Sequence, residues 1–180
     1  MKKKIEEKIE IPHGFNVDVD GTTIKIAKDS VMIEKKMPFN LKKHENFIII
    51  EKNSATKNDK KLIKTSLAHI KNIFSGLEKK FVYKLQICNV HFPMNVERRG
   101  EEIVIKNFLG EVKERKAKIL PGIEVKVEKD IIIVSGHDKE KAGQTAANIE
   151  TATRIKSRDR RVFQDGIFLI EKEKGKRKEK

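Results

Sequence analysis

The arginines of this chain are concentrated in one short segment. Of its eight arginines, four lie in residues 154–161, RIKSRDRR, and none occurs before Arg98, whereas lysines are spread along the whole chain. A guanidinium binds phosphate through parallel hydrogen bonds and stacks on bases, while a surface lysine supplies mainly a point charge. The segment 154–161 is therefore the first candidate for contact with an anionic partner.

The net charge supports such a partner. The formal charge is +14, from 41 basic and 27 acidic residues, and both halves of the chain carry part of the excess. A positive field of this extent favours nucleic acid or an anionic membrane surface. No apolar run approaches the roughly 20 residues that span a bilayer, and the charged N-terminus shows no secretory segment. The single cysteine, Cys88, fits a reducing compartment. We expect a soluble intracellular protein that binds nucleic acid and has no membrane partner.

The two halves of the sequence repeat each other. The pattern Gly-x-x-Ile-x-Ile occurs at residues 21–26 and again at 100–105, and Asp59 has its counterpart in Asp138 at the same offset of 79 residues. A period near 80 is too long for a solenoid and indicates two copies of a small domain. We place the first copy at residues 1–80, the second at 81–170 and a basic tail at 171–180. We expect the tail to be disordered unless a partner orders it.

Period-two alternation of apolar residues predicts short strands in both copies. The expected strands lie near residues 9–11, 17–19, 24–26, 31–33, 47–50, 81–87, 103–105, 112, 123–127, 131–134 and 167–170. We expect a loop at 51–58, and we expect the strand 81–87 to couple the copies rigidly, since no Gly or Pro linker separates them. The predicted fold class is α+β, with two similar tandem domains, each an antiparallel sheet with one helix packed on a face.

One helix is predicted at the end of each copy. Asp59 is expected to cap the first and Gly76 to end it, with an apolar face of Ile63, Leu67, Ile70 and Phe74. Asp138 is expected to cap the second, whose matching residues are Ala142, Ala146 and Ile149. Because the second helix is rich in small residues, it permits close approach to the sheet, to another protein or to an RNA backbone.

Several segments of the second half carry a family resemblance. Residues 136–150, GHDKEKAGQTAANIE, and 159–168, DRRVFQDGIF, resemble the signature of the ribosomal protein L-six family of the large subunit. Residues 91–94, HFPM, and 107–111, NFLGE, are similar to motifs of its archaeal and eukaryotic branch. The resemblance covers residues 5–170. It implies two similar α+β domains near the base of the stalk, and a C-terminal domain that binds ribosomal RNA close to the sarcin–ricin loop, where translational GTPases dock. Positions 158–166 depart from the bacterial branch, so no residue roles are transferred to them from bacterial relatives.

The candidate RNA contacts lie mostly in and around residues 154–161. Five positive charges against one carboxylate exceed what a helix dipole attracts at a helix end. Alternation places Lys116 and Lys118 on one strand face, while Gln144 and Asn148 share a helix face, for which partner contact and solvent exposure stay open. Phe163 either stacks on a base or packs. The expected RNA-binding residues are Asn107, Lys116, Lys118, Lys139, Gln144, Asn148, Arg154, Lys156, Arg158, Arg160, Arg161 and Gln164.

No pattern in the sequence indicates catalysis. The five histidines are scattered, and zinc spacings, phosphate-binding Gly-Lys-Ser or Gly-Lys-Thr loops, nucleophile elbows and paired carboxylates are absent. His91 is read as a structural residue at the domain junction. We expect no enzyme, no metal, no cofactor and no small-molecule substrate.

The predicted function is that of a structural constituent of the large ribosomal subunit that binds its rRNA in the cytoplasm. Its further partners are neighbouring ribosomal proteins and, transiently, translational GTPases. The alternative is a free-standing basic adaptor that docks another protein through the alanine-rich second helix.

Overall fold

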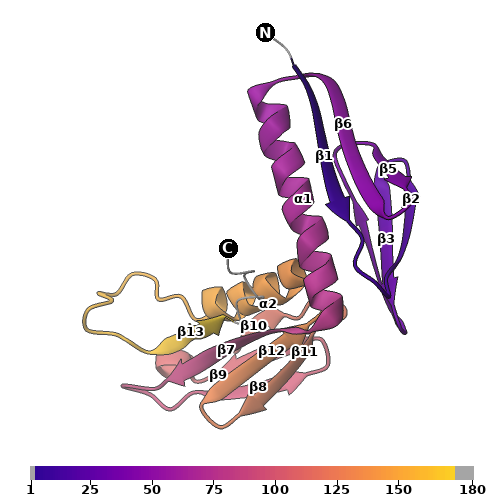
Figure 1. Cartoon of the computed structure of the whole chain (residues 1–180). Helices are drawn as coiled ribbons and strands as arrows, with labels where there is room; N and C mark the ends of the chain where they lie inside the picture. Colours follow the sequence, from indigo (N-terminus) through magenta and orange to yellow (C-terminus); the bar gives the residue numbers. More distant parts are fainter. Residues whose placement is uncertain (1–2, 173–180) are drawn as a thin grey trace. The chain divides into compact units, whose positions relative to one another are not determined.

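The computed structural model describes residues 3–172, which form two compact units (Figure 1). The first unit ends at Glu78 and the second begins at Lys79. Each unit has its own apolar core of buried residues and its own antiparallel sheets. The predicted α+β fold class is confirmed.

The first unit contains two three-stranded antiparallel sheets, in the orders β1-β6-β5 and β2-β3-β4. Its strands are β1 (Lys3–Glu10), β2 (Asn16–Asp20), β3 (Thr23–Lys28), β4 (Val31–Lys36), β5 (Leu41–His44) and β6 (Phe47–Ala55). Alternate residues point inward as predicted, since Ile24 and Ile26 of β3 and Ile48 and Ile50 of β6 are completely buried. The expected loop at 51–58 is wrong in part, because β6 continues to Ala55.

Helix α1 (Lys57–Glu78) differs from the prediction at both ends. It is capped by Thr56, whose carbonyl accepts from the Lys60 N–H and whose hydroxyl accepts from the Asp59 N–H at 3.3 Å. The Asp59 carboxylate accepts from the Thr56 N–H at 2.9 Å, so the two residues form a reciprocal capping box. Asp59 therefore lies within the first turn. Gly76 does not end the helix but is buried inside it.

The second unit has a four-stranded antiparallel sheet, β11-β12-β7-β13, and a three-stranded one, β10-β9-β8. Its elements are β7 (Phe81–Cys88), β8 (Asn95–Arg99), β9 (Glu102–Lys106), the short 3-10 helix η1 (Phe108–Gly110), β10 (Arg115–Lys118), β11 (Glu124–Glu128), β12 (Ile131–Gly136), α2 (Lys139–Ala152) and β13 (Gly166–Lys172). Two predictions are wrong here. Val112 lies in an irregular connection, fully exposed, and Ile123 precedes β11.

The two units share one strand arrangement. In the first, β6 lies between β1 and β5, and β3 lies between β2 and β4; in the second, β12 lies between β7 and β11, and β9 lies between β8 and β10. Within each unit, the strands follow the same order along the chain, and this agreement supports the internal duplication.

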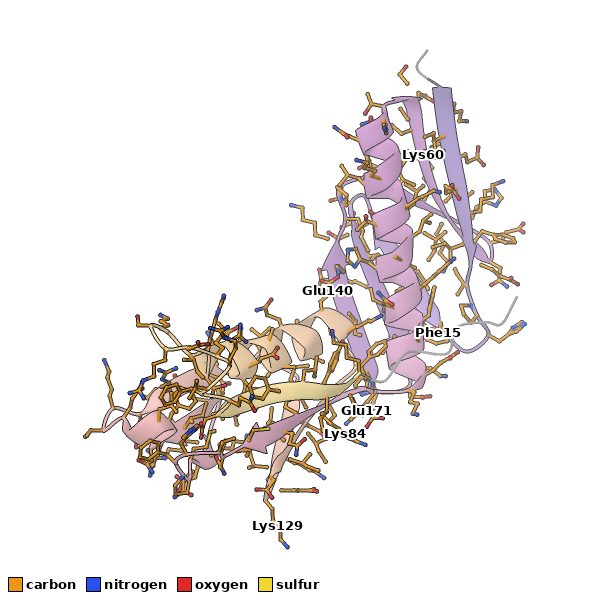
Figure 2. The ribbon with its side chains drawn as sticks, turned by 90° about the vertical axis from the view of Figure 1, so that its left-hand side faces the viewer. Phe15, Lys60, Lys84, Lys129, Glu140 and Glu171 are labelled. Carbon is orange, nitrogen blue, oxygen red and sulfur yellow. The ribbon has the colours of Figure 1, made fainter. Side chains whose placement is uncertain are left out.

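Strand β13 is the addition that distinguishes the second unit. It pairs with the edge of β7 that corresponds to the outer edge of β1. Figure 2 shows Lys84 of β7 beside Glu171 of β13, joined by an ion pair at 2.7 Å. Residues 171 and 172 thus belong to a strand, contrary to their assignment to the tail, and residues 173–180 of the expected tail lie outside the described residues.

Helix α2 packs closely on its sheet through small residues. Its cap is as predicted, because the Asp138 carboxylate accepts from the N–H groups of Glu140 and Lys141. Ala142 and Ala146 are buried, and the Tyr83 hydroxyl of β7 lies 3.3 Å from the place where a side chain on Gly143 would begin. The small-residue face therefore fills the core of this unit.

Candidate nucleic-acid interface

The arginine segment, residues 153–165, connects α2 to β13, and both its ends are tied together by one threonine. Thr153 is buried at the end of α2. Its hydroxyl donates to the Glu150 carbonyl at 3.1 Å and accepts from the buried N–H of Ile167, in β13, at 2.9 Å. The exit from the helix and the entry to the strand are thereby fixed next to each other, and the residues between them protrude as a loop.

Arg115 of β10 supports the start of this segment. Its Nη1 donates to the carbonyls of Ala152 and Arg154, at 2.9 and 3.2 Å. The rest of the guanidinium forms two hydrogen bonds with the Glu111 carboxylate, at 2.8 and 2.6 Å, which lower the pKa of Glu111. The group also lies over the Phe108 ring, 4.3 Å from its centroid. Arg115 is thus engaged within the protein and holds the carbonyls at the end of α2.

Asp165 holds the other end of the segment. It is 1% exposed, and its Oδ1 accepts from the N–H groups of Val90, His91 and Phe92, at 2.9, 2.8 and 3.4 Å. Its Oδ2 lies 2.6 Å from His91 Nδ1. Burial alone would raise the pKa of Asp165, but the hydrogen bonds from His91, Val90 and Phe92 together lower it to about 2. The carboxylate joins residues 90–92 to the arginine segment and gives His91 a structural role. The expected place of His91 at the domain junction is wrong, because the boundary between the units lies at Glu78 and Lys79 and His91 lies inside the second unit.

Phe163 packs between the two joined loops. Its ring lies 5.1 Å from the His91 ring and against the apolar core of the unit. On its other side the Arg158 guanidinium lies 4.8 Å from the ring centroid. Of the two interpretations open for Phe163, the structure shows the packing role, and it also places Arg158 by a cation–π contact.

The cations of the segment differ in their availability. Arg161 forms a two-pronged contact with Asp159, its Nη2 and Nε lying 2.9 and 3.2 Å from Oδ2, and Gln164 donates to the Arg161 carbonyl at 3.3 Å. In contrast, three exposed cations of the segment make neither an ion pair nor a contact with an aromatic ring within residues 3–172. They are Arg154, Lys156 and Arg160, whereas Arg158, which also makes no ion pair, lies over the Phe163 ring.

Two hollows flank these free cations. A groove of about 430 Å³ between β10 and the end of α2 brings Lys116 together with Arg154 and Lys156. A pocket of about 840 Å³ on the other side is lined by Arg154, Arg160, Arg161 and Gln164 among others. Six of the twelve predicted contact residues therefore gather around two adjoining concave surfaces.

The remaining predicted residues lie elsewhere or are occupied. Asn107 donates to the Pro93 carbonyl at 2.9 Å, and Gln144 donates to Asn148, which in turn donates to the Lys118 carbonyl at 3.1 Å. Lys118 is exposed on the same face of β10 as Lys116, as alternation predicts. Lys139 begins α2, whereas Arg154 follows its end, so about 20 Å of helix separates them.

Arg115 and Asp165, which hold the two ends of the arginine segment, were not predicted as site residues from the sequence. The sequence marks Arg115 only by its charge and Asp165 only as part of a turn. A carboxylate that follows an arginine-rich loop and immediately precedes a strand offers little sequence signal. The buried position of Asp165 depends on residues 90–92, more than 70 positions earlier.

Comparisons with known proteins identify the family of this chain. The model of the family described as Ribosomal protein L6 matches residues 92–166, which include the arginine segment. The chain is 41% identical to "Large ribosomal subunit protein uL6" of Methanococcus vannielii, over 93% of this chain and 94% of that protein. It is 43% identical to the protein of the same name from Sulfurisphaera tokodaii, over 93% and 92% of the two chains.

The chain belongs to the ribosomal protein L6 family. The resemblance inferred from the sequence is thereby confirmed, and both relatives are archaeal-type members that align over nearly the whole chain. Residues 3–172 contain no cluster of His, Cys, Asp and Glu suited to a metal ion. Within the same range, no helix combines the length and apolar character needed to cross a membrane.

Proposed function

We propose that this member of the L6 family is a structural constituent of the large ribosomal subunit that binds large-subunit rRNA through its second unit. The observation that carries the proposal is the group of free cations, Arg154, Lys156 and Arg160, on a loop that Thr153, Arg115 and Asp165 hold in place. Because the loop backbone is already held, binding of phosphate must order only the cation side chains and not the loop itself.

The mechanism is charge neutralisation combined with shape recognition. Each cation that meets a phosphate releases condensed counterions, which favours binding strongly at low salt. Folded RNA presents backbone phosphates and 2′-hydroxyls more readily than base edges, so two concave surfaces with cations on their rims suit it. The groove that joins Lys116 to Arg154 and Lys156 is one such surface.

The finer placement is part of the proposal and is supported by the family resemblance alone. As a ribosomal protein of the large subunit, the chain works in the cytoplasmic ribosome, with neighbouring ribosomal proteins as further partners. We propose a position near the base of the stalk and the sarcin–ricin loop, with transient contact with translational GTPases. The role is structural and not catalytic.

The alternative of a protein–protein adaptor is less well supported. It required the small residues of α2 to face a partner, but Ala142 and Ala146 are buried against the sheet. Gln144 and Asn148 on the outer side are engaged with each other and with β10.

A salt titration of variants tests the proposal. We expect replacement of Arg154, Lys156 and Arg160 by Ala to weaken binding to in vitro transcribed large-subunit rRNA by about 100-fold near 0.1 M salt. Removing a cation that neutralises one phosphate should lower the slope of log affinity against log salt by about 0.7–0.9. The measurement is filter binding at several salt concentrations.

The matched control removes three cations from the first unit. Lys60, Lys61 and Lys64 lie on α1, with Lys60 marked in Figure 2. We expect their replacement by Ala to change affinity severalfold at most. Equal losses of affinity in the two triple variants would show that the general lysine field binds the RNA, and affinity independent of salt would overturn rRNA binding through phosphates.

A further inference from the structure

We propose that the pocket beside the arginine segment, defined by Cys88, Val90, Glu150, Phe163 and Phe168 under the Arg154 and Arg160 side chains, takes one unstacked nucleobase of the bound RNA. This inference rests on the proposed function and adds a specific subsite to it. All of the lining residues belong to the second unit, so the pocket is a property of that unit alone.

The pocket has the size that a nucleotide needs. Its volume is about 840 Å³, within the roughly 300–1,000 Å³ of ligand sites in proteins. One wall is formed by Cys88, at the end of β7, and by Val90 in the loop that Asp165 holds. Another wall is formed by Glu150 and Thr151 in the last turn of α2 and by residues 153–155. The hydrogen bonds of Asp165 and Thr153 thus fix both walls before any ligand arrives.

Its walls carry apolar surface that the protein leaves exposed. The Val90 side chain is 60% exposed and Phe168 is 37% exposed, although both lie in an ordered loop and a strand. Phe168 reaches this position because residue 166 is glycine. Gly166 has a φ of 155°, and a Cβ there would lie 3.0 Å from the Phe168 ring. A partly exposed aromatic ring in the lining of a pocket is a side chain on which single-stranded bases stack.

The polar groups at the rim complement the rest of a nucleotide. Arg154 and Arg160 make no ion pair within the residues that the structure describes and are suited to the phosphates on either side of the base. The exposed Glu150 carboxylate is an acceptor for the exocyclic amino group of adenine, guanine or cytosine. Asp165 takes no such part, since its oxygens are occupied by residues 90–92.

Other ligands fit only part of this surface. A free phosphate would use the guanidiniums and leave the apolar walls exposed to water. An apolar peptide side chain would use the walls and leave Glu150 and the arginines without a role. A nucleotide uses the walls through its base and the arginines through its phosphates, so it matches both.

The test removes the stacking surface without removing charge. Phe168→Ala is compared with Phe47→Ala, because Phe47 is also a half-exposed strand phenylalanine, 43% exposed, but lies in the first unit. We expect Phe168→Ala to weaken binding to the large-subunit rRNA transcript roughly tenfold, in the range measured for loss of one base stack. The salt slope should stay unchanged, since every cation that meets a phosphate is still present. Phe47→Ala should bind as the unaltered chain does.

Two further measurements test the nucleobase site even if Phe168→Ala folds poorly. Phe168→Leu retains apolar volume but lacks the ring, and we expect the same direction of change if Phe168→Ala folds poorly. Cys88, the chain's single cysteine, lines the pocket and reports on its occupancy. Its alkylation by iodoacetamide should slow at least tenfold in the complex with the transcript.

The possible failures are separable. Steeply salt-dependent binding together with equal affinities for Phe168→Ala and Phe47→Ala, or with unprotected Cys88, overturns the nucleobase site and leaves rRNA binding intact. Loss of salt-dependent binding in the unaltered chain overturns the proposed function itself.

Discussion

The two units of this protein have the same strand arrangement but end differently. In the first, α1 passes within three residues into β7. In the second, α2 is followed by residues 153–165 and then by β13, which extends the sheet. The free arginines and the buried Asp165 belong to this addition, and the pocket forms where the addition meets β7, Val90 and the last turn of α2. A duplicated scaffold can therefore keep its core and gain a binding surface at one point, where a helix returns to the sheet.

The helices differ in a way that suits this division. α1 has 22 residues and buries bulky side chains such as Ile63, Ile70 and Phe74. α2 has 14 residues and buries alanines, with Gly143 against Tyr83. Because small residues bring α2 close to the sheet, Arg115 of β10 can reach the carbonyls at its end. The short, close-packed helix is thus part of what positions the arginine segment.

The largest effect on stability is expected for the replacement of Asp165 by Ala, which removes an interaction that only the second unit has. Three backbone N–H groups and the His91 ring would lose their acceptor, and we expect the second unit to lose about 3 kcal/mol of unfolding free energy. Urea denaturation followed by tyrosine fluorescence measures this unit alone, because Tyr83 is the only tyrosine and tryptophan is absent.

Asp159→Ala is the matched control for Asp165→Ala. Asp159 lies in the same segment, but it is exposed and pairs with the exposed Arg161. An exposed ion pair contributes little to stability, so we expect no measurable change in the unfolding free energy of the second unit. Similar losses of stability in both variants would show that the buried hydrogen bonds of Asp165 do not hold the segment.

Lowering the pH should weaken the same Asp165 interactions, with a somewhat smaller loss of stability than Asp165→Ala causes. The pKa of Asp165 falls from 3.8 to about 2 on folding, so its contribution is complete above about pH 4 and is lost as the pH falls toward 2. The size of the shift corresponds to about 2 kcal/mol. We expect the unaltered chain to lose about that much more stability between pH 5 and pH 2 than Asp165→Asn does. Parallel pH profiles, measured by tyrosine fluorescence in urea, would contradict this.

The sequence predicted the features that depend on local pattern. Alternation located most of the strands but missed β5 and β8. The apolar spacing of α1 and the Asp138 cap of α2 were correct. The errors lie where the local signal is ambiguous. Thr56 and Asp59 are both residue types that cap helices well. Only the geometry of their reciprocal hydrogen bonds shows that Thr56 is the N-cap residue and that Asp59 lies in the first turn. Gly76 ends a helix by propensity, but the packing of the last turn of α1 keeps it helical.

The candidate site was predictable in outline and not in detail. Residue types alone marked Arg154, Arg158 and Arg160, because the single carboxylate of Asp159 cannot balance the cations around it. Whether an arginine is free depends on contacts between distant segments. Arg115 is occupied by Glu111 and by two carbonyls 37 and 39 residues away. The pocket is lined by residues of β7 and β13, which are far apart in the sequence, so no local sequence pattern could predict it.

The smallest expected loss of stability is that caused by removing a helix cap. Removing the cap of each helix in turn also tests whether the two units unfold separately. Asp138→Ala removes the acceptor for two N–H groups of α2, and Thr56→Ala removes the corresponding cap of α1. Each should cost its own unit about 1 kcal/mol. Because each unit has its own buried core, we expect Asp138→Ala to lower the midpoint of the tyrosine transition in urea. Thr56→Ala should leave that midpoint in place and shift only the loss of helical circular dichroism. A tyrosine midpoint that moves equally in both variants would contradict this and would show that the two units unfold together.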